Sequence, residues 1–181
     1  MMSLSHAMRL SKPAESLMAA AFLTLFFSSA SFSAEKMAVF EFEIIRSNVI
    51  AGVREDREAE ARRLAMIGAR LRERLAASGQ FELVDIAPAA ARAAASNLRS
   101  CGGCADDFAK ELGAAYSVTG TVQKVSELIL NINVYIHAAA TSQPLAAVSV
   151  DIRGNTDESW RRGIEYLCKN VLMPRLEKLK L

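Results

Sequence analysis

The amino-acid sequence predicts an α/β sandwich in which a mixed, largely antiparallel sheet carries helices mainly on one face. Two patterns indicate this class. Residues 128–137 alternate between apolar and polar side chains, as in a strand of a sheet that is covered on one side. Residues 55–78 instead repeat their apolar side chains at helical spacing. Along the whole chain, the expected element order is β-α-β-α-α-β-β-β-α.

The first strand is expected over Met37–Ile45, and the long helix follows it. In the strand, Phe40 and Phe42 should share one face, and Glu41 and Glu43 should share the other. Gly79 should end the helix in a left-handed conformation. The helix should bury one apolar stripe, formed by Leu64, Ile67, Leu71 and Leu75.

Three short elements are expected in the middle of the chain. Phe81–Ile86 forms a strand, and Pro88 opens a short alanine-rich helix, because its missing N–H would be unpaired at that position anyway. Ala105–Leu112 forms a second short helix. Asp106 and Asp107 occupy its first turn, where carboxylates suit the positive end of the helix dipole.

Three strands and a helix complete the prediction. The strands are Ala115–Val125, Leu128–His137 and Leu145–Gly154. In the second strand the apolar side chains should be buried together, namely Leu128, Leu130, Ile132, Val134 and Ile136. Thr156 is the expected N-cap of the last helix. Its buried stripe should consist of Trp160, Ile164, Leu167 and Val171. Pro174 should kink or end this helix, and residues 175–181 can carry on as a last helical turn.

The N-terminal residues 1–33 have the features of a secretory signal peptide: positive charge, then an apolar run, then small residues before a cleavage site. The apolar run is too short for a stable transmembrane helix, which needs about 20 residues. An uncleaved N-terminal anchor is the alternative. We therefore expect a single exported domain over residues 34–181, located in the periplasm and without a membrane span after cleavage.

The charge balance restricts the class of partner. Cleavage would remove Arg9, Lys12 and Glu15, so the net charge of +2 would fall by one. Nucleic-acid-binding domains usually carry a basic stripe, and this chain has none. A nucleic-acid partner is therefore not expected.

Several stretches resemble known families. The segment "ADDFAKELGAAYSVTGTVQKVSELILNINVYIHAAAT", with "AVFEFE" and "GQFELVDI", is similar in pattern to the N-terminal domain of TolB and to CsgG-like and penicillin-binding-protein-activator domains. "SCGGC", "VTGTVQKVS", "LILNINVYI" and "DIRGNTDESWRRG" resemble a family of secreted bacterial proteins that is a domain of unknown function. The resemblance implies a TolB-N-like α/β domain and carries over no catalytic residue. It also implies a link to bacteria that oxidise alcohols with quinoproteins.

Cys101 and Cys104 lie three positions apart, close enough for a disulfide, and an oxidising compartment favours one. A structural disulfide that holds the loop is our first interpretation. A redox-active pair at a helix N-terminus is the second, although Asp106 and Asp107 disfavour a thiolate there. A metal site would lack four good ligands, because His137 is the only histidine after residue 33.

Polar side chains share one face of the strand at 128–137. They are the candidate partner-binding residues Asn131, Asn133, Tyr135 and His137. Such a face can dock a partner or simply meet solvent. No acid is adjacent to His137 in the sequence, so it is a poor general base, and no serine has the context of a nucleophile elbow. Cys168 should be a buried free thiol. We predict no catalytic residue, no bound metal and no cofactor.

The sequence therefore favours a non-enzymatic periplasmic accessory or adaptor module. It would bind another envelope or periplasmic protein through the open sheet face or a sheet edge. The alternative is a periplasmic thiol-redox accessory that uses Cys101 and Cys104, with the link to quinoprotein alcohol oxidation given above. A receptor for a small polar ligand is a third hypothesis.

Overall fold

The computed structural model of the chain describes residues 34–46 and 56–179. The predicted signal peptide, residues 1–33, lies outside them. The predicted α/β class and the element order are confirmed. The elements are β1 (Glu35–Val39), β2 (Glu43–Arg46), α1 (Arg57–Ala77), β3 (Phe81–Leu83), α2 (Ala87–Ala95), α3 (Cys104–Glu111), β4 (Tyr116–Lys124), β5 (Ile129–Ala138), β6 (Gln143–Arg153), α4 (Asp157–Tyr166), a π-helical segment η1 (Leu167–Leu172) and α5 (Met173–Leu179).

The six strands form one mixed sheet. Its order is β3-β1-β4-β5-β6, and β2 pairs with β4 beyond the end of β1. The pairings of β1 with β3 and of β1 and β2 with β4 are parallel and short. The pairings of β4 with β5 and of β5 with β6 are antiparallel and extend over nearly the whole strands. The sheet is thus largely antiparallel, as predicted.

The predicted first strand is interrupted. Val39 is opposite Val118 of β4, but Glu43 is opposite Thr121, so three residues of this segment face only two of β4. This is the arrangement of a β-bulge, which resets the alternation of side chains. Phe40 therefore packs with the alanines of α2 and α3, whereas Phe42 packs in the core under α1. The prediction that the two rings share a face is wrong for this reason.

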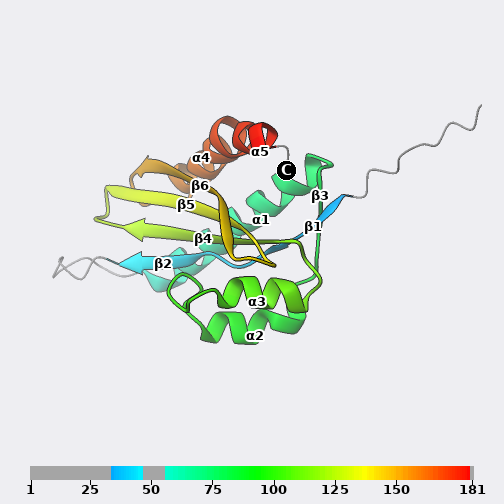
Figure 1. The fold of residues 1–181 in the computed structure, drawn as a ribbon. Coiled ribbons are helices and arrows are strands. Elements are labelled where there is room, and N and C mark those ends of the chain that lie inside the picture. The colour runs from blue at the N-terminus through cyan, green and yellow to red at the C-terminus, as the bar shows by residue number, and fades with distance from the viewer. Residues whose placement is uncertain (1–33, 47–55, 180–181) are drawn as a thin grey trace, which may run out of the picture. The chain divides into compact units, whose positions relative to one another are not determined.

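The helices lie on both faces of the sheet, with the larger group on one (Figure 1). Side chains of α1, α4, η1 and α5 form the main core with one face of β4, β5 and β6. A smaller core, rich in alanine, lies between α2, α3 and the opposite face near β1. No helix in the described part of the chain is both long enough and apolar enough to cross a membrane.

Helix α1 has the predicted apolar stripe. Its N-cap Asp56 accepts a hydrogen bond from the Ala59 N–H, with an N···O distance of 3.0 Å. Ile67, Leu71 and Leu75 are fully buried, and the fourth member of the predicted stripe is half-buried. Gly79 has a φ of 68°, which confirms the left-handed residue after the helix.

The alternation of β5 is confirmed except at its start. The apolar residues from Leu130 to Ile136 are fully buried on the main-core face. Leu128 was grouped with them, but it precedes the strand and is 71 % exposed. It lies in the turn between β4 and β5, where the chain no longer runs beside the core, so the period of two does not apply to it.

The C-terminal helix begins as predicted, and the last helical turn expected after Pro174 forms as part of α5. The Thr156 hydroxyl accepts a hydrogen bond from the Ser159 N–H, which confirms the N-cap. The sequence predicts that Pro174 kinks or ends the helix, yet helical backbone continues through η1 into α5. A proline clashes with the carbonyl four residues earlier in a regular α-helix. The wider π-helical turn directly before Pro174 changes that spacing, so the helix continues.

Candidate functional site

The four predicted partner-binding residues lie together on the sheet face opposite the main core. The register of β4, β5 and β6 places their polar neighbours on the same side. We call this surface the polar sheet face. It comprises Ser117, Thr119, Thr121, Gln123, Asn131, Asn133, Tyr135, His137, Ser149 and Asp151. All four predicted residues are half-buried.

Asn131 is fixed by β6. Its amide nitrogen donates to the Asp151 carboxylate at 2.7 Å, and its amide oxygen accepts from the Ser149 hydroxyl at 3.0 Å. Both partners come from the neighbouring strand, directly across or two residues along. The side chain is therefore held in one orientation on the sheet.

Asn133 and Thr121 are opposite one another in the β4–β5 register, and the side chains of both lack hydrogen-bond partners in the described part of the chain. The Thr121 residue is 1 % exposed, and its hydroxyl has no hydrogen-bond partner within the described part of the chain. The Asn133 amide is half-buried and likewise makes no side-chain hydrogen bond to any described residue. Buried polar groups in native proteins are nearly always paired, so the Thr121 hydroxyl is exceptional.

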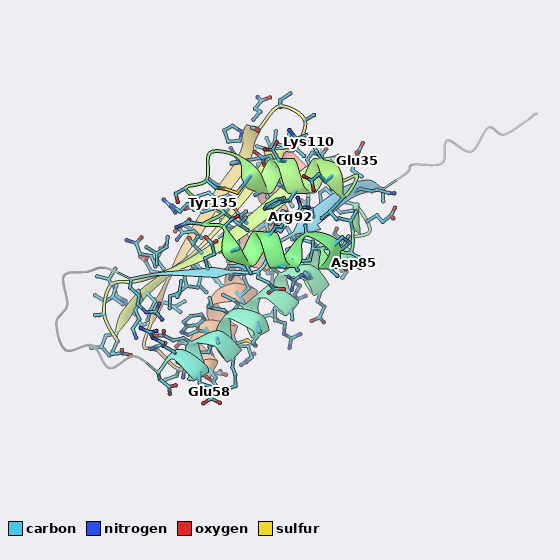
Figure 2. The ribbon with its side chains drawn as sticks, turned by 90° about the horizontal axis from the view of Figure 1, so that it is seen from below. Glu35, Glu58, Asp85, Arg92, Lys110 and Tyr135 are labelled. Carbon is cyan, nitrogen blue, oxygen red and sulfur yellow. A yellow bond between two sulfur atoms is a disulfide. The ribbon has the colours of Figure 1, made fainter. Side chains whose placement is uncertain are left out.

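Tyr135 is held by Arg99, which the sequence did not single out. The Arg99 guanidinium donates to the Tyr135 hydroxyl at 2.7 Å and lies 5.3 Å from the centre of its ring. Both a charge-assisted hydrogen bond and a cation–π contact therefore fix the ring. Arg99 belongs to the loop between α2 and α3. Figure 2 shows Tyr135 at the end of these two helices where that loop runs.

His137 has an acidic neighbour that comes from another part of the chain. Its Nδ1 lies 3.3 Å from the carboxylate of Asp106, a residue of α3 that is 1 % exposed and 31 positions earlier in the chain. The other carboxylate oxygen of Asp106 accepts a hydrogen bond from the Ser117 hydroxyl. The sequence indicated no acid beside His137, which is wrong in space because Asp106 packs against it.

This Ser-Asp-His cluster does not have the geometry of a hydrolase. In a serine triad the histidine contacts the serine and removes its proton, while the acid contacts only the histidine. Here Asp106 lies between Ser117 and His137, and the serine donates to the carboxylate. Ser117 is also buried. The cluster joins α3 to β4 and β5 and leaves the serine without a base.

Cys101 and Cys104 are joined in a disulfide, with their Cα atoms 5.7 Å apart. The two residues between them, Gly102 and Gly103, have φ angles of 73° and 105°. Side chains rarely adopt such angles, which explains the glycine pair. The disulfide closes a ring of residues 101–104, which joins the end of the loop that carries Arg99 to the first residue of α3. It therefore supports the loop whose arginine fixes Tyr135.

Cys168 is a buried free thiol, as predicted. Burial, followed by the negative charge of Glu165, raises the pKa of this thiol to about 12. A thiol that keeps its proton at neutral pH is a poor nucleophile. Among the described residues, no cluster of three or more His, Cys, Asp or Glu side chains could hold a metal ion.

A family model, DUF3280, described as "Protein of unknown function (DUF2380)", matches residues 35–172. Among curated proteins, none matches the chain.

Several solved structures are similar in fold at low identity. The LpoB C-terminal domain from Salmonella enterica is 15% identical, with a TM-score of 0.47 over 68% of this chain and 86% of that one. The hypothetical protein CT253 from Chlamydia trachomatis is 12% identical, with a TM-score of 0.46 over 82% and 92%. The lipoprotein GNA1162 from Neisseria meningitidis is 14% identical, with a TM-score of 0.42 over 79% and 91%.

Proposed function

The chain belongs to the DUF3280 family, and we propose that it acts as a non-enzymatic periplasmic adaptor that binds another envelope protein through its polar sheet face. The proposal places the working domain at residues 34–181, after a signal peptide at residues 1–33. It assigns partner contacts to Asn131, Asn133, Tyr135 and His137. It assigns no catalytic residue and no cofactor.

The single observation that carries the proposal lies at the centre of the face. There, the Asn133 amide and the Thr121 hydroxyl have no side-chain hydrogen-bond partner among the described residues. The Asn133 amide is half-buried, so it can donate hydrogen bonds to a docked chain and accept them from it. The Thr121 hydroxyl opposite it is buried and unpaired within the described part of the chain, which costs about 1–3 kcal/mol of stability.

The side chains around this pair are already ordered. Asn131 is held by β6 and Tyr135 by Arg99. Ordering a free side chain on binding costs about 0.5–1.5 kcal/mol, and residues held in place before binding avoid that cost. Tyrosine and arginine are also enriched where proteins meet. The face is thus prepared for a polar partner surface.

The disulfide supports this role without taking part in electron transfer. It closes residues 101–104, two positions after Arg99, whose guanidinium donates a hydrogen bond to Tyr135. Asp106 and Asp107 lie in the first turn of α3, directly after Cys104, and disfavour a thiolate there. We therefore expect a reduction potential below about −300 mV, as for structural disulfides.

The experiment is a quantitative pull-down of the tagged, exported protein from periplasmic extract. Asn133→Asp combined with Tyr135→Ala should reduce partner recovery about tenfold, equivalent to 1.4 kcal/mol of binding free energy. A matched control makes the same two changes on the C-terminal helical segment, as Asn170→Asp with Tyr166→Ala, both at exposed positions. It should retain the partner.

A third variant separates docking from redox chemistry. Cys101→Ser with Cys104→Ser should keep most of the binding, because neither substitution replaces a side chain of the polar sheet face. Equal recovery with the polar-face variant and its control would contradict the proposal. Complete loss of binding in the serine variant, with the fold intact by circular dichroism, would favour the thiol-redox alternative.

A further inference from the structure

One edge of the sheet lies beside α2 and has no strand against it in the described part of the chain. Within those residues, strand β3 pairs with residues 35–37 of β1 alone, and the chain then leaves the sheet towards α2. Beyond Val39, the edge strand continues as β2, which has β4 as its only strand neighbour in the described part of the chain. An edge of this kind presents unpaired backbone N–H and C=O groups to any strand that approaches it.

A groove of about 430 Å³ follows this edge, between residues 40–43 and helix α2. Its apolar lining includes Phe40, Phe42 and Leu98, and its helical wall is made of alanines such as Ala90 and Ala94. Because these alanines are small and exposed, a side chain from another molecule has room to enter. Figure 2 looks onto α2 from the side opposite the main core, with Asp85 just before its first turn.

Carboxylates line the same groove. Glu41, Glu43 and Asp85 all contribute to its walls. Glu41 pairs with Arg72 at 2.6 Å, whereas Glu43 and Asp85 accept only backbone N–H groups, from Leu98 and Ala87. Neither Glu43 nor Asp85 forms a salt bridge with another described residue. The groove is therefore apolar at its base and negative at its rim.

We propose that this edge and groove bind an extended, basic segment of a partner protein, which adds as a strand along residues 41–46. In strand addition, backbone hydrogen bonds provide affinity, and alternate side chains enter pockets and provide specificity. An apolar side chain of the segment fills the groove, and lysine or arginine next to it meets Glu43 and Asp85. The contacts are separate from the polar sheet face, so the inference does not depend on the proposed function.

The probes are two short fluorescent peptides of equal length, one alternating leucine with lysine and the other alternating leucine with glutamate. Binding to the full exported chain is measured by fluorescence anisotropy. The lysine peptide should bind at least about tenfold more tightly than the glutamate peptide. Equal affinity, or binding of neither peptide, would overturn the inference.

A matched pair of variants on α2 tests the groove. Ala90 lines it, and the neighbouring exposed Ala91 does not. Ala90→Arg should weaken the lysine peptide about tenfold, while Ala91→Arg, with the same added charge on the same helix, should leave its affinity unchanged. Asp85→Asn is a second variant that keeps the oxygen which accepts from Ala87. It should also weaken binding. Equal affinities of all variants would contradict the inference.

Amide hydrogen exchange locates the added strand. The lysine peptide should slow exchange of the backbone amides between residues 41 and 46 and leave those of β6, at the other edge of the sheet, unchanged. Protection along β6 instead would overturn the assignment. The alternative occupant of the groove is a second copy of the chain, and sedimentation of the free protein tests it. A dimer that Ala90→Arg dissociates would assign the groove to that second copy and exclude the basic peptide.

Discussion

Phe42 lies against Gly120 so closely that no side chain fits between them. A Cβ atom built on Gly120 would be 2.3 Å from Cε1 of the Phe42 ring. The bulge before β2 turns this ring towards the main core, and the bare backbone of β4 makes the space for it. Gly120 of β4 thus makes room for a ring that the bulge between β1 and β2, distant in sequence, turns towards it.

Gly120→Ala should destabilise the protein, because the added methyl group forces the ring or the strand to move. Overpacking of this kind costs about 1–3 kcal/mol. Urea unfolding, followed by circular dichroism, measures the loss. Phe42→Ala alone should cost about 3–5 kcal/mol through the cavity it leaves. The double variant should lose less than the sum of the two. If the losses in the two single variants simply add up in the double variant, the contact between Phe42 and Gly120 is not the cause of the destabilisation by Gly120→Ala.

Glu127 should make stability fall in acid. Burial opposes its ionisation, but hydrogen bonds from Lys124 and Asn155 together outweigh burial and hold the pKa of its carboxyl below the ordinary value of 4.5. A lowered pKa in the folded state gives stability above the unfolded pKa, which is lost as pH falls through the folded value. Urea midpoints should therefore drop below about pH 4.5, and Glu127→Gln should flatten that dependence. An unchanged slope in the variant would contradict this assignment.

The disulfide should contribute modestly to stability. A loop as small as Cys101–Cys104 restricts the unfolded chain by roughly 2 kcal/mol in the chain-entropy model. Cys101→Ser with Cys104→Ser should lower the free energy of unfolding by about that amount. The loss should appear in α3 and near Tyr135, as faster amide exchange. Unchanged exchange there would mean that the disulfide does not support the Arg99 loop.

Cys168 should be unreactive until the protein unfolds. Its thiol is buried in the main core, and its pKa is raised to about 12. A chromogenic disulfide reagent at pH 8 should therefore detect no thiol in the native protein and one per chain in denaturant. Rapid native reaction would show that the core near η1 opens far more readily than its packing indicates.

The sequence was informative where burial imposes a regular period. Ile132 and Val134 could be assigned to the core because a sheet covered on one side requires alternation, and β5 follows that rule from Leu130 to Ile136. The rule fails at Phe40 and Phe42, since one extra residue against β4 changes the face, and nothing within "VFEFE" marks the shift. Local patterns carry no information about register against a strand that is distant in sequence.

The polar sheet face was likewise predicted only as far as local sequence patterns reach. Its four β5 residues were found from alternation alone, whereas Arg99 and Asp106 were missed as their partners. Each reaches β5 only because the α2–α3 layer packs against the sheet. Asp106 was assigned to the positive end of the helix dipole, as many first-turn acids are. Its burial on α3 depends on its partners Ser117 and His137, which lie on β4 and β5 and are not marked by any pattern within the helix.

The final prediction concerns Asp106, which is the buried link between Ser117 and His137. Asp106→Leu should destabilise the fold by about 1–3 kcal/mol, because it leaves the buried Ser117 hydroxyl without an acceptor. Asp106→Asn keeps an oxygen that can accept from Ser117 and should cost less. Ser117→Ala combined with Asp106→Leu removes both partners, and it should recover part of the loss measured by urea unfolding, because replacing a hydrogen-bonded pair by apolar groups is often nearly neutral. If the loss in free energy of unfolding in the double variant instead equals the sum of the losses in the two single variants, the hydrogen bond between Ser117 and Asp106 does not explain the effect of Asp106→Leu.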